Sequence, residues 1–200
     1  MRRSTFAILL ITAFSSMIGM GVIAPFLPVF AKQHGANGFW MGFIFAGFGI
    51  SRGIIMPIVG RLSDRIGRKI FVAGGLFLFT VISLFYPLAN SIFTLTIVRM
   101  VHGLAAGMIM PIVMAYVGDL AEEGKEGEFT GAVNMMFYLG LAAGPFLGGM
   151  LNHYFGFDSV FFAMSALGAV TFLIVVVFLP KDKGLEARKQ EAVRSFHSLI

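Results

Sequence analysis

Three side chains that can carry a charge interrupt otherwise apolar stretches of the sequence. Arg52 lies among Gly, Ile and Ser residues, and Arg99 and His102 lie three residues apart in a later apolar run. A charge near the centre of a bilayer costs at least about 2.5–3.5 kcal/mol, so such residues usually face a cavity or a partner. An arginine there can bind an anion or shift the pKa of a nearby carboxyl group, and a histidine can titrate near neutral pH. All three are therefore candidates for a substrate or proton pathway. The alternative is structural: the arginines bond to helix carbonyls and His102 is a hydrogen-bonded packing residue.

The composition shows which solvent these residues meet. Of the 200 residues, 58% are AVILMFWYC and 12% are charged, against about 25% charged in typical soluble domains. A compact, water-facing surface cannot hide so much apolar area, so an ordinary soluble enzyme is excluded. The absence of cysteine also excludes a disulfide framework and cysteine-based zinc sites. Lipid is therefore the expected surrounding.

Six apolar stretches are each long enough, at about 20 residues, to cross a bilayer. They cover residues 6–31, 38–60, 70–88, 92–117, 130–151 and 159–179. These stretches predict an all-α membrane protein with one transmembrane domain over residues 1–179. The basic start of the chain is not read as a cleaved signal peptide, because the first stretch is long and contains Pro25 and Pro28. Residues 180–200 are charged and amphipathic, which predicts a linker or tail along the membrane surface.

The lysines and arginines are distributed unevenly between the two sides of the membrane. One set of connecting segments and both termini hold nearly all of them, whereas the opposite set holds only Lys32. By the positive-inside rule, both termini are cytoplasmic in a multi-pass protein of the cell membrane. The net charge of +5 is therefore a topology signal, and no nucleic-acid-binding module is recognisable.

The link between the second and third stretches reads GRLSDRIGRK over residues 60–69. Gly60 and Gly67 permit close approach or positive φ at the helix ends. Arg65 and Arg68 can each form a two-pronged bond with a carboxylate, and Asp119 ends the fourth stretch on the same side. The simpler interpretation is that these charges only set the topology.

The order of residue types in this link resembles the G-x-L-x-D-R-x-G-R-K loop of the major facilitator superfamily. Three other segments resemble motifs of the same family in the matching spans. The first span has Ile18-Gly19 and Pro25-Phe26-Leu27-Pro28, and the fourth has Leu95, Arg99, Gly103 and Ala105-Ala106, with His102 where glutamine is usual. The fifth span has Gly140, Gly144, Pro145, Gly148 and Gly149, as in the drug/proton antiporter branch.

This resemblance implies half of a twelve-helix secondary transporter, most similar to multidrug efflux antiporters, with no enzyme activity and no cofactor. Its expected partners are membrane lipid, a small-molecule substrate and a second six-helix half, from a separate chain or a second copy. In the family, the loop latches the two halves together in the outward-facing state. The resemblance assigns that latch to Gly60, Asp64, Arg65, Gly67, Arg68 and Asp119. The alternative is a truncated, non-transporting half or an assembly subunit.

Proton coupling remains open on the sequence alone, because none of the ten acidic residues lies within a predicted span. Proton-coupled transporters generally need a membrane-embedded group that gains and loses a proton. Either that carboxylate lies elsewhere, or His102 replaces it, or transport is not driven by protons.

Transporter halves are often built from two inverted three-helix repeats, and the sequence contains a recurring frame of this kind. The spacing of Gly60, Leu62 and Gly67 recurs in Gly149, Leu151 and Gly156. Within the fifth span, glycines at spacing four allow close helix packing, and Pro145 removes a backbone donor and predicts a bend.

Other classes of six-span protein lack their sequence signatures. There is no G-x-S-x-G of a serine hydrolase and no G-x-x-x-x-G-K-[ST] of an ATP-driven transporter. Neither a regular series of arginines nor a carbonyl-rich filter sequence indicates a channel.

Overall fold

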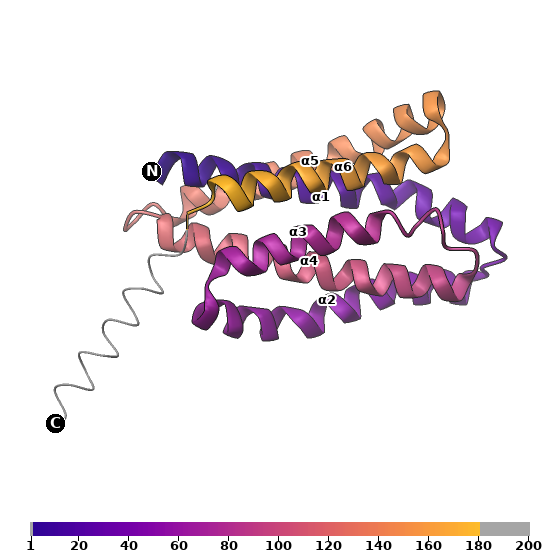
Figure 1. Ribbon diagram of the computed structural model, residues 1–200, viewed down its shortest axis with the longest axis horizontal. Helices are drawn as coiled ribbons and strands as arrows, with labels where there is room; N and C mark the ends of the chain where they lie inside the picture. The colour runs from indigo at the N-terminus through magenta and orange to yellow at the C-terminus, as the bar shows by residue number, and fades with distance from the viewer. Residues whose placement is uncertain (1, 181–200) are drawn as a thin grey trace.

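A computed structural model describes residues 2–180, and this part of the chain forms six helices and no strand (Figure 1). The helices are α1 (Arg2–Gln33), α2 (Gly38–Ile66), α3 (Arg68–Ser83), α4 (Ile92–Leu120), α5 (Glu126–Phe155) and α6 (Phe157–Phe178). The all-α prediction is confirmed. The predicted surface segment after the sixth span lies outside the described residues, apart from Pro180.

Five of these helices are long and apolar enough to cross a membrane, and α3 is the exception. It has 16 residues and ends at Ser83, five residues before the predicted end. At 1.5 Å per residue it is about 24 Å long, shorter than the hydrocarbon core of about 30 Å. Pro87 accounts for the difference, because it lacks an N–H and disfavours helical geometry at Tyr86.

The helix pairings repeat between the two halves of the bundle. α1 packs chiefly on α5 and also on α6, α4 packs chiefly on α2 and also on α3, and α3 packs on α6. Exchanging α1 with α4, α2 with α5 and α3 with α6 leaves these pairings unchanged. That symmetry is what two three-helix repeats of inverted topology produce, and it agrees with the repeat predicted from the sequence.

Two helix connections consist of one glycine each. Gly67 joins α2 to α3 with φ 115°, and Gly156 joins α5 to α6 with φ 84°. Each glycine N–H donates to the carbonyl four residues earlier, at 2.9 Å for Gly67 and 3.1 Å for Gly156. A side chain at such φ values meets its own backbone, so glycine is the residue that fits. These two glycines are the equivalent positions of the recurring frame.

Glycines also set the distance between the long helices. A Cβ atom on Gly144 of α5 would lie 2.6 Å from the Cα of Gly21 on α1, whereas one on Gly149 would meet nothing within 4 Å. On α4, Gly103 and Gly107 lie in the same way against α2. The Ser51 hydroxyl fastens that second interface by donating to the Met100 carbonyl at 2.7 Å.

Candidate functional site: a buried arginine junction and two cavities

One end of the bundle holds the N-terminus and the α2–α3 and α4–α5 connections (Figure 1); this end is called the basic end below. Arg68, the first residue of α3, is 5% exposed there. Its Nη1 donates to the Ala115 carbonyl at 2.6 Å and forms an ion pair with Asp119. Its Nη2 lies 3.4 Å from Oδ1 of Asp64. One guanidinium thus joins the end of α2, the start of α3 and the end of α4.

The other predicted latch residues lie around this junction. Arg65 is exposed, and among the described residues Arg68 alone makes the predicted arginine pairing to Asp119. Gly67 supplies the turn. Gly60 lies inside α2, and a Cβ on it would meet nothing within 4 Å, so no close approach to Gly60 occurs within this bundle.

Arg99 and His102 come together inside the bundle, near the opposite end. His102 is 2% exposed, and its Nδ1 lies 2.9 Å from the Tyr86 hydroxyl, within hydrogen-bonding distance. The rings of Phe48 and Phe79 pack edge-on against the imidazole, at 5.9 and 4.8 Å between centroids. Ending α3 early is what allows Tyr86 to turn inward and reach His102.

Arg99 is 3% exposed and lies beside the same group. Its guanidinium carbon is 4.2 Å from the centroid of the Phe48 ring, a cation–π contact. Its Nε and Nη1 atoms have no hydrogen-bond partner among the residues that the structure describes. Unpaired buried donors are costly, so this charge has capacity for an acceptor that the described bundle does not supply.

Arg52 belongs to a different part of the molecule. It lines a cavity of about 250 Å³ between α2, α4 and α5, together with Asn134 and Tyr138. The sequence singled out Arg52 but missed the two α5 residues. Thr130, Asn134 and Tyr138 are all exposed at spacing four, which puts them on one face of α5. That spacing is the signal that was available in the sequence.

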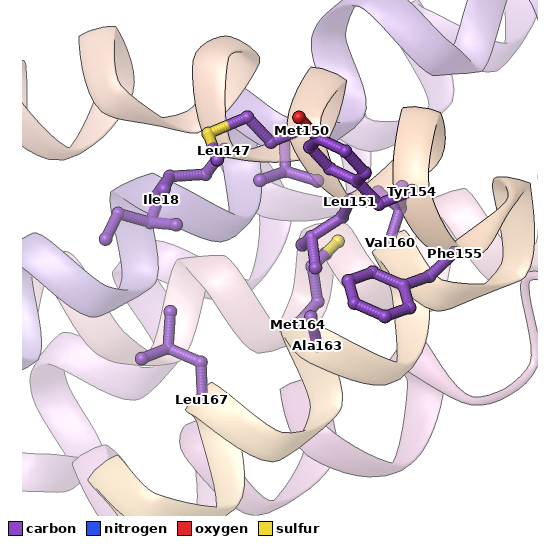
Figure 2. A pocket seen from close by; sticks show the side chains of 11 residues that line it. Ile18, Leu147, Met150, Leu151, Tyr154, Phe155, Val160, Ala163, Met164 and Leu167 are labelled. Atoms are coloured by element: carbon purple, nitrogen blue, oxygen red, sulfur yellow. The ribbon is translucent and has the colours of Figure 1, made fainter.

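A second cavity, of about 310 Å³, lies between α1, α5 and α6 (Figure 2). Its lining is apolar except for the Tyr154 hydroxyl. It therefore offers no charged side chain to a ligand.

Comparison with known proteins places this geometry in a family. A family model described as Major Facilitator Superfamily matches residues 9–199. An uncharacterised MFS-type transporter of Methanocaldococcus jannaschii is 31% identical over 94% of this chain and 50% of its own length. Multidrug resistance protein 2 of Bacillus subtilis is 33% identical over 94% of this chain and 47% of its own. Quinolone resistance protein NorA of Staphylococcus aureus is 30% identical over 88% and 45%. The chain thus spans about half the length of the curated relatives it matches.

A solved structure gives the same fold. The human organic anion transporter MFSD10 superposes with a TM-score of 0.78 at 19% identity, over 90% of this chain and 48% of that one. The family consists of transport proteins rather than enzymes, and the apolar helices make this chain a multi-pass membrane protein. With the family model matched over nearly all of its length, the chain belongs to the major facilitator superfamily.

Proposed function

We propose that this chain forms one half of a secondary transporter that exports small molecules across the cell membrane by alternating access. The observation that carries the proposal is the Arg68 junction, where one buried guanidinium ties two helix ends to a third through Asp64 and Asp119. The basic end, where α1 starts and α6 ends (Figure 1), is the cytoplasmic end, because the basic residues gather on that side.

A second six-helix half covers the face that carries Arg52, Asn134 and Tyr138. Arg52 is half-buried and lies at the middle of α2, and Asn134 is exposed on α5. Polar and charged groups at that depth are costly against lipid, so they face a water-filled cavity or protein. The second half is a separate chain or a second copy of this one, and the transport cavity lies between the two halves.

The junction serves as a latch on the cytoplasmic side. Arg68 holds the α2–α3 turn against the end of α4, and half of the Asp64 side chain remains exposed, at 49%. Asp64 is therefore accessible to a helix end of the second half, where its negative charge is favourable at a helix N-terminus. Closing this contact stabilises the outward-facing state, and opening it admits substrate from the cytoplasm.

Arg99 is the charge centre of the coupling pathway. Two of its donors are unpaired and its surroundings exclude water, so a carboxylate or a substrate anion from across the cavity interface would be bound strongly. A bound carboxylate would have its pKa lowered by the guanidinium. Movement of Arg99 would then release or take up a proton at that carboxyl group.

The relatives named for multidrug and quinolone resistance support export of drug-sized molecules. The test is efflux of a fluorescent drug from cells expressing the protein. Asp64→Asn removes the charge and keeps the shape, and we expect it to lower the efflux rate at least tenfold with unchanged membrane abundance. Glu122→Gln, in the exposed pair with Lys125, is the control and leaves efflux unchanged. Equal efflux by wild type and Asp64→Asn would refute the latch.

A further inference from the structure

The cavity between α2, α4 and α5 is lined by hydrogen-bond donors and by no acidic residue. Arg52 contributes five N–H groups, Asn134 two and Tyr138 one. The rest of the lining is apolar: Met56, Met110, Pro111, Met114 and Phe137. With a volume of about 250 Å³, the cavity is smaller than most complete ligand pockets, which begin near 300 Å³. It therefore has the size expected of part of a binding site, with the remaining part supplied by a facing surface.

Arg52 carries the only formal charge on this lining and lies far from any counter-charge. Fourteen residues separate it from each end of α2, or about 21 Å in each direction. The acidic residues of the neighbouring helices lie near their ends, at Asp119 on α4 and at Glu126 and Glu128 on α5. No carboxylate pairs with the Arg52 side chain among residues 2–180.

This charge arrangement discriminates between ligand classes. A cation in the cavity would meet the like charge of Arg52, which is unfavourable. A neutral molecule can accept a hydrogen bond from the guanidinium but leaves its charge uncompensated. A carboxylate or sulfonate accepts two parallel hydrogen bonds from arginine, and such charge-assisted pairs are about twice as strong as neutral ones.

We infer that this cavity binds an organic anion with a flat, apolar body. Arg52 holds the anionic group, and Asn134 and Tyr138 lie within the same cavity to donate further hydrogen bonds. The methionines and Phe137 contact the body, since thioethers adapt to irregular shapes and pack well against aromatic rings. The inference rests on the proposed function, because it names the substrate class of the same transport cavity.

Binding of three probes with one aromatic body tests the inference: 2-naphthoate, 2-naphthamide and 2-naphthylmethylammonium. The full chain is extracted in native nanodiscs, which retain any bound second half, and the binding of each radiolabelled probe is corrected for empty discs. We expect naphthoate to bind at least tenfold more tightly than the amide, and the ammonium compound to bind most weakly.

Variants then locate the effect. Arg52→Gln lowers naphthoate affinity about tenfold or more, as expected for a hydrogen bond to a charged group, and leaves naphthamide affinity within twofold. Arg52→Lys keeps the charge without the planar fork and gives an intermediate loss. Arg61→Gln removes an exposed cation from the same helix, outside the cavity, and binds all three probes as wild type does.

Equal affinity for the three probes, or a naphthoate affinity that Arg52→Gln leaves unchanged, overturns the inference. Absence of naphthoate binding overturns it as well. None of these results affects the latch, because drug efflux that depends on Asp64 is measured separately. Conversely, loss of the Asp64 effect refutes the proposed transport mechanism even where Arg52 still selects the anion.

Discussion

Arg68 and Arg99 are almost equally buried, but their surroundings differ. Arg68 meets two carboxylates and a carbonyl at the end of the bundle, so its charge is compensated within this half. Arg99 lies against the faces of Phe48 and Phe45, and two of its nitrogen atoms lack acceptors in the described bundle. A buried arginine that loses its carboxylate partners is left with an uncompensated charge, which is destabilising, and this fits a structural junction at Arg68. An incompletely satisfied charge fits a site that acts on something outside this half.

The packing around His102 favours a structural role for this residue over a role in proton transfer. Three aromatic rings enclose it, and its Nδ1 lies within hydrogen-bonding distance of Tyr86. We expect His102→Gln to retain substrate flux driven by a pH gradient, because an amide can also bond the Tyr86 hydroxyl. His102→Leu removes the imidazole partner of that hydroxyl and lowers stability by about 1–3 kcal/mol. Flux under an imposed pH gradient and thermal unfolding in detergent provide the two measurements.

One result would contradict a structural role for His102. If His102→Gln folds normally and binds substrate but loses only the pH-driven flux, His102 carries the coupling proton. The control is substrate flux measured without a pH gradient, because that flux does not depend on a titrating group.

In the charged link over residues 60–69, the sequence did not show which arginine is buried. Both Arg65 and Arg68 were expected to pair with Asp119, because all three lie on the same side of the membrane. Only Arg68 begins α3 after the positive-φ turn at Gly67 and is buried. Which of two nearby arginines is buried depends on the direction in which the new helix leaves the turn. Hydropathy carries no information on that direction.

At the scale of elements, close packing at small residues joins α5 to α1 and α4 to α2. Small residues on α5 contact α1, and small residues on α4 contact α2. Pro145 has no N–H to offer the Leu141 carbonyl, and that oxygen lies against Gly21: a Cβ there would come within 2.5 Å of it. Only a residue without a side chain fits against the Leu141 carbonyl, and Gly21 is that residue at the α1–α5 interface.

Substitution of Gly144 tests the close packing of these helices. Gly144→Ala forces a methyl group to within 2.6 Å of the α1 backbone, which cannot yield as a flexible side chain can. We expect a stability loss of about 1–3 kcal/mol and a marked loss of efflux. The matched control is Gly149→Ala, five residues along the same helix and in open space, which is neutral or slightly stabilising because alanine favours helices. Equal melting temperatures for the two variants would show that the interface is not closely packed.

The elements themselves were largely predictable. Apolar length located all six helices, and the recurring glycine frame marked where α2 meets α3 and where α5 meets α6. That a single glycine forms each connection was not predicted. The early end of α3 was not predicted, because residues 84–88 are apolar and hydropathy cannot distinguish an apolar turn from a helix. What decides the matter is Pro87 together with the hydrogen bond between Tyr86 and His102, a contact between residues 16 apart.

The whole molecule presents two kinds of outer surface. Most of it is apolar, as lipid requires, but the face of α2 and α5 carries Arg52, Thr130, Asn134 and Tyr138. The sequence predicted that a second half exists through the resemblance alone. A physical argument supports that proposal, because this polar face is costly against lipid. The face itself was not predicted, since it depends on how α2 and α5 are rotated about their axes.

Accessibility of that face from each side of the membrane tests alternating access most directly. The chain has no cysteine, so Tyr138→Cys introduces a single thiol in the cavity and Leu173→Cys, exposed on α6, serves as a lipid-facing control. In oriented vesicles, a membrane-impermeant maleimide added from either side labels position 138 and leaves position 173 unlabelled. Adding Asp64→Asn opens the latch and raises the share of labelling from the cytoplasmic side at least severalfold. Labelling of position 138 from one side only, with no change on Asp64→Asn, would contradict the account.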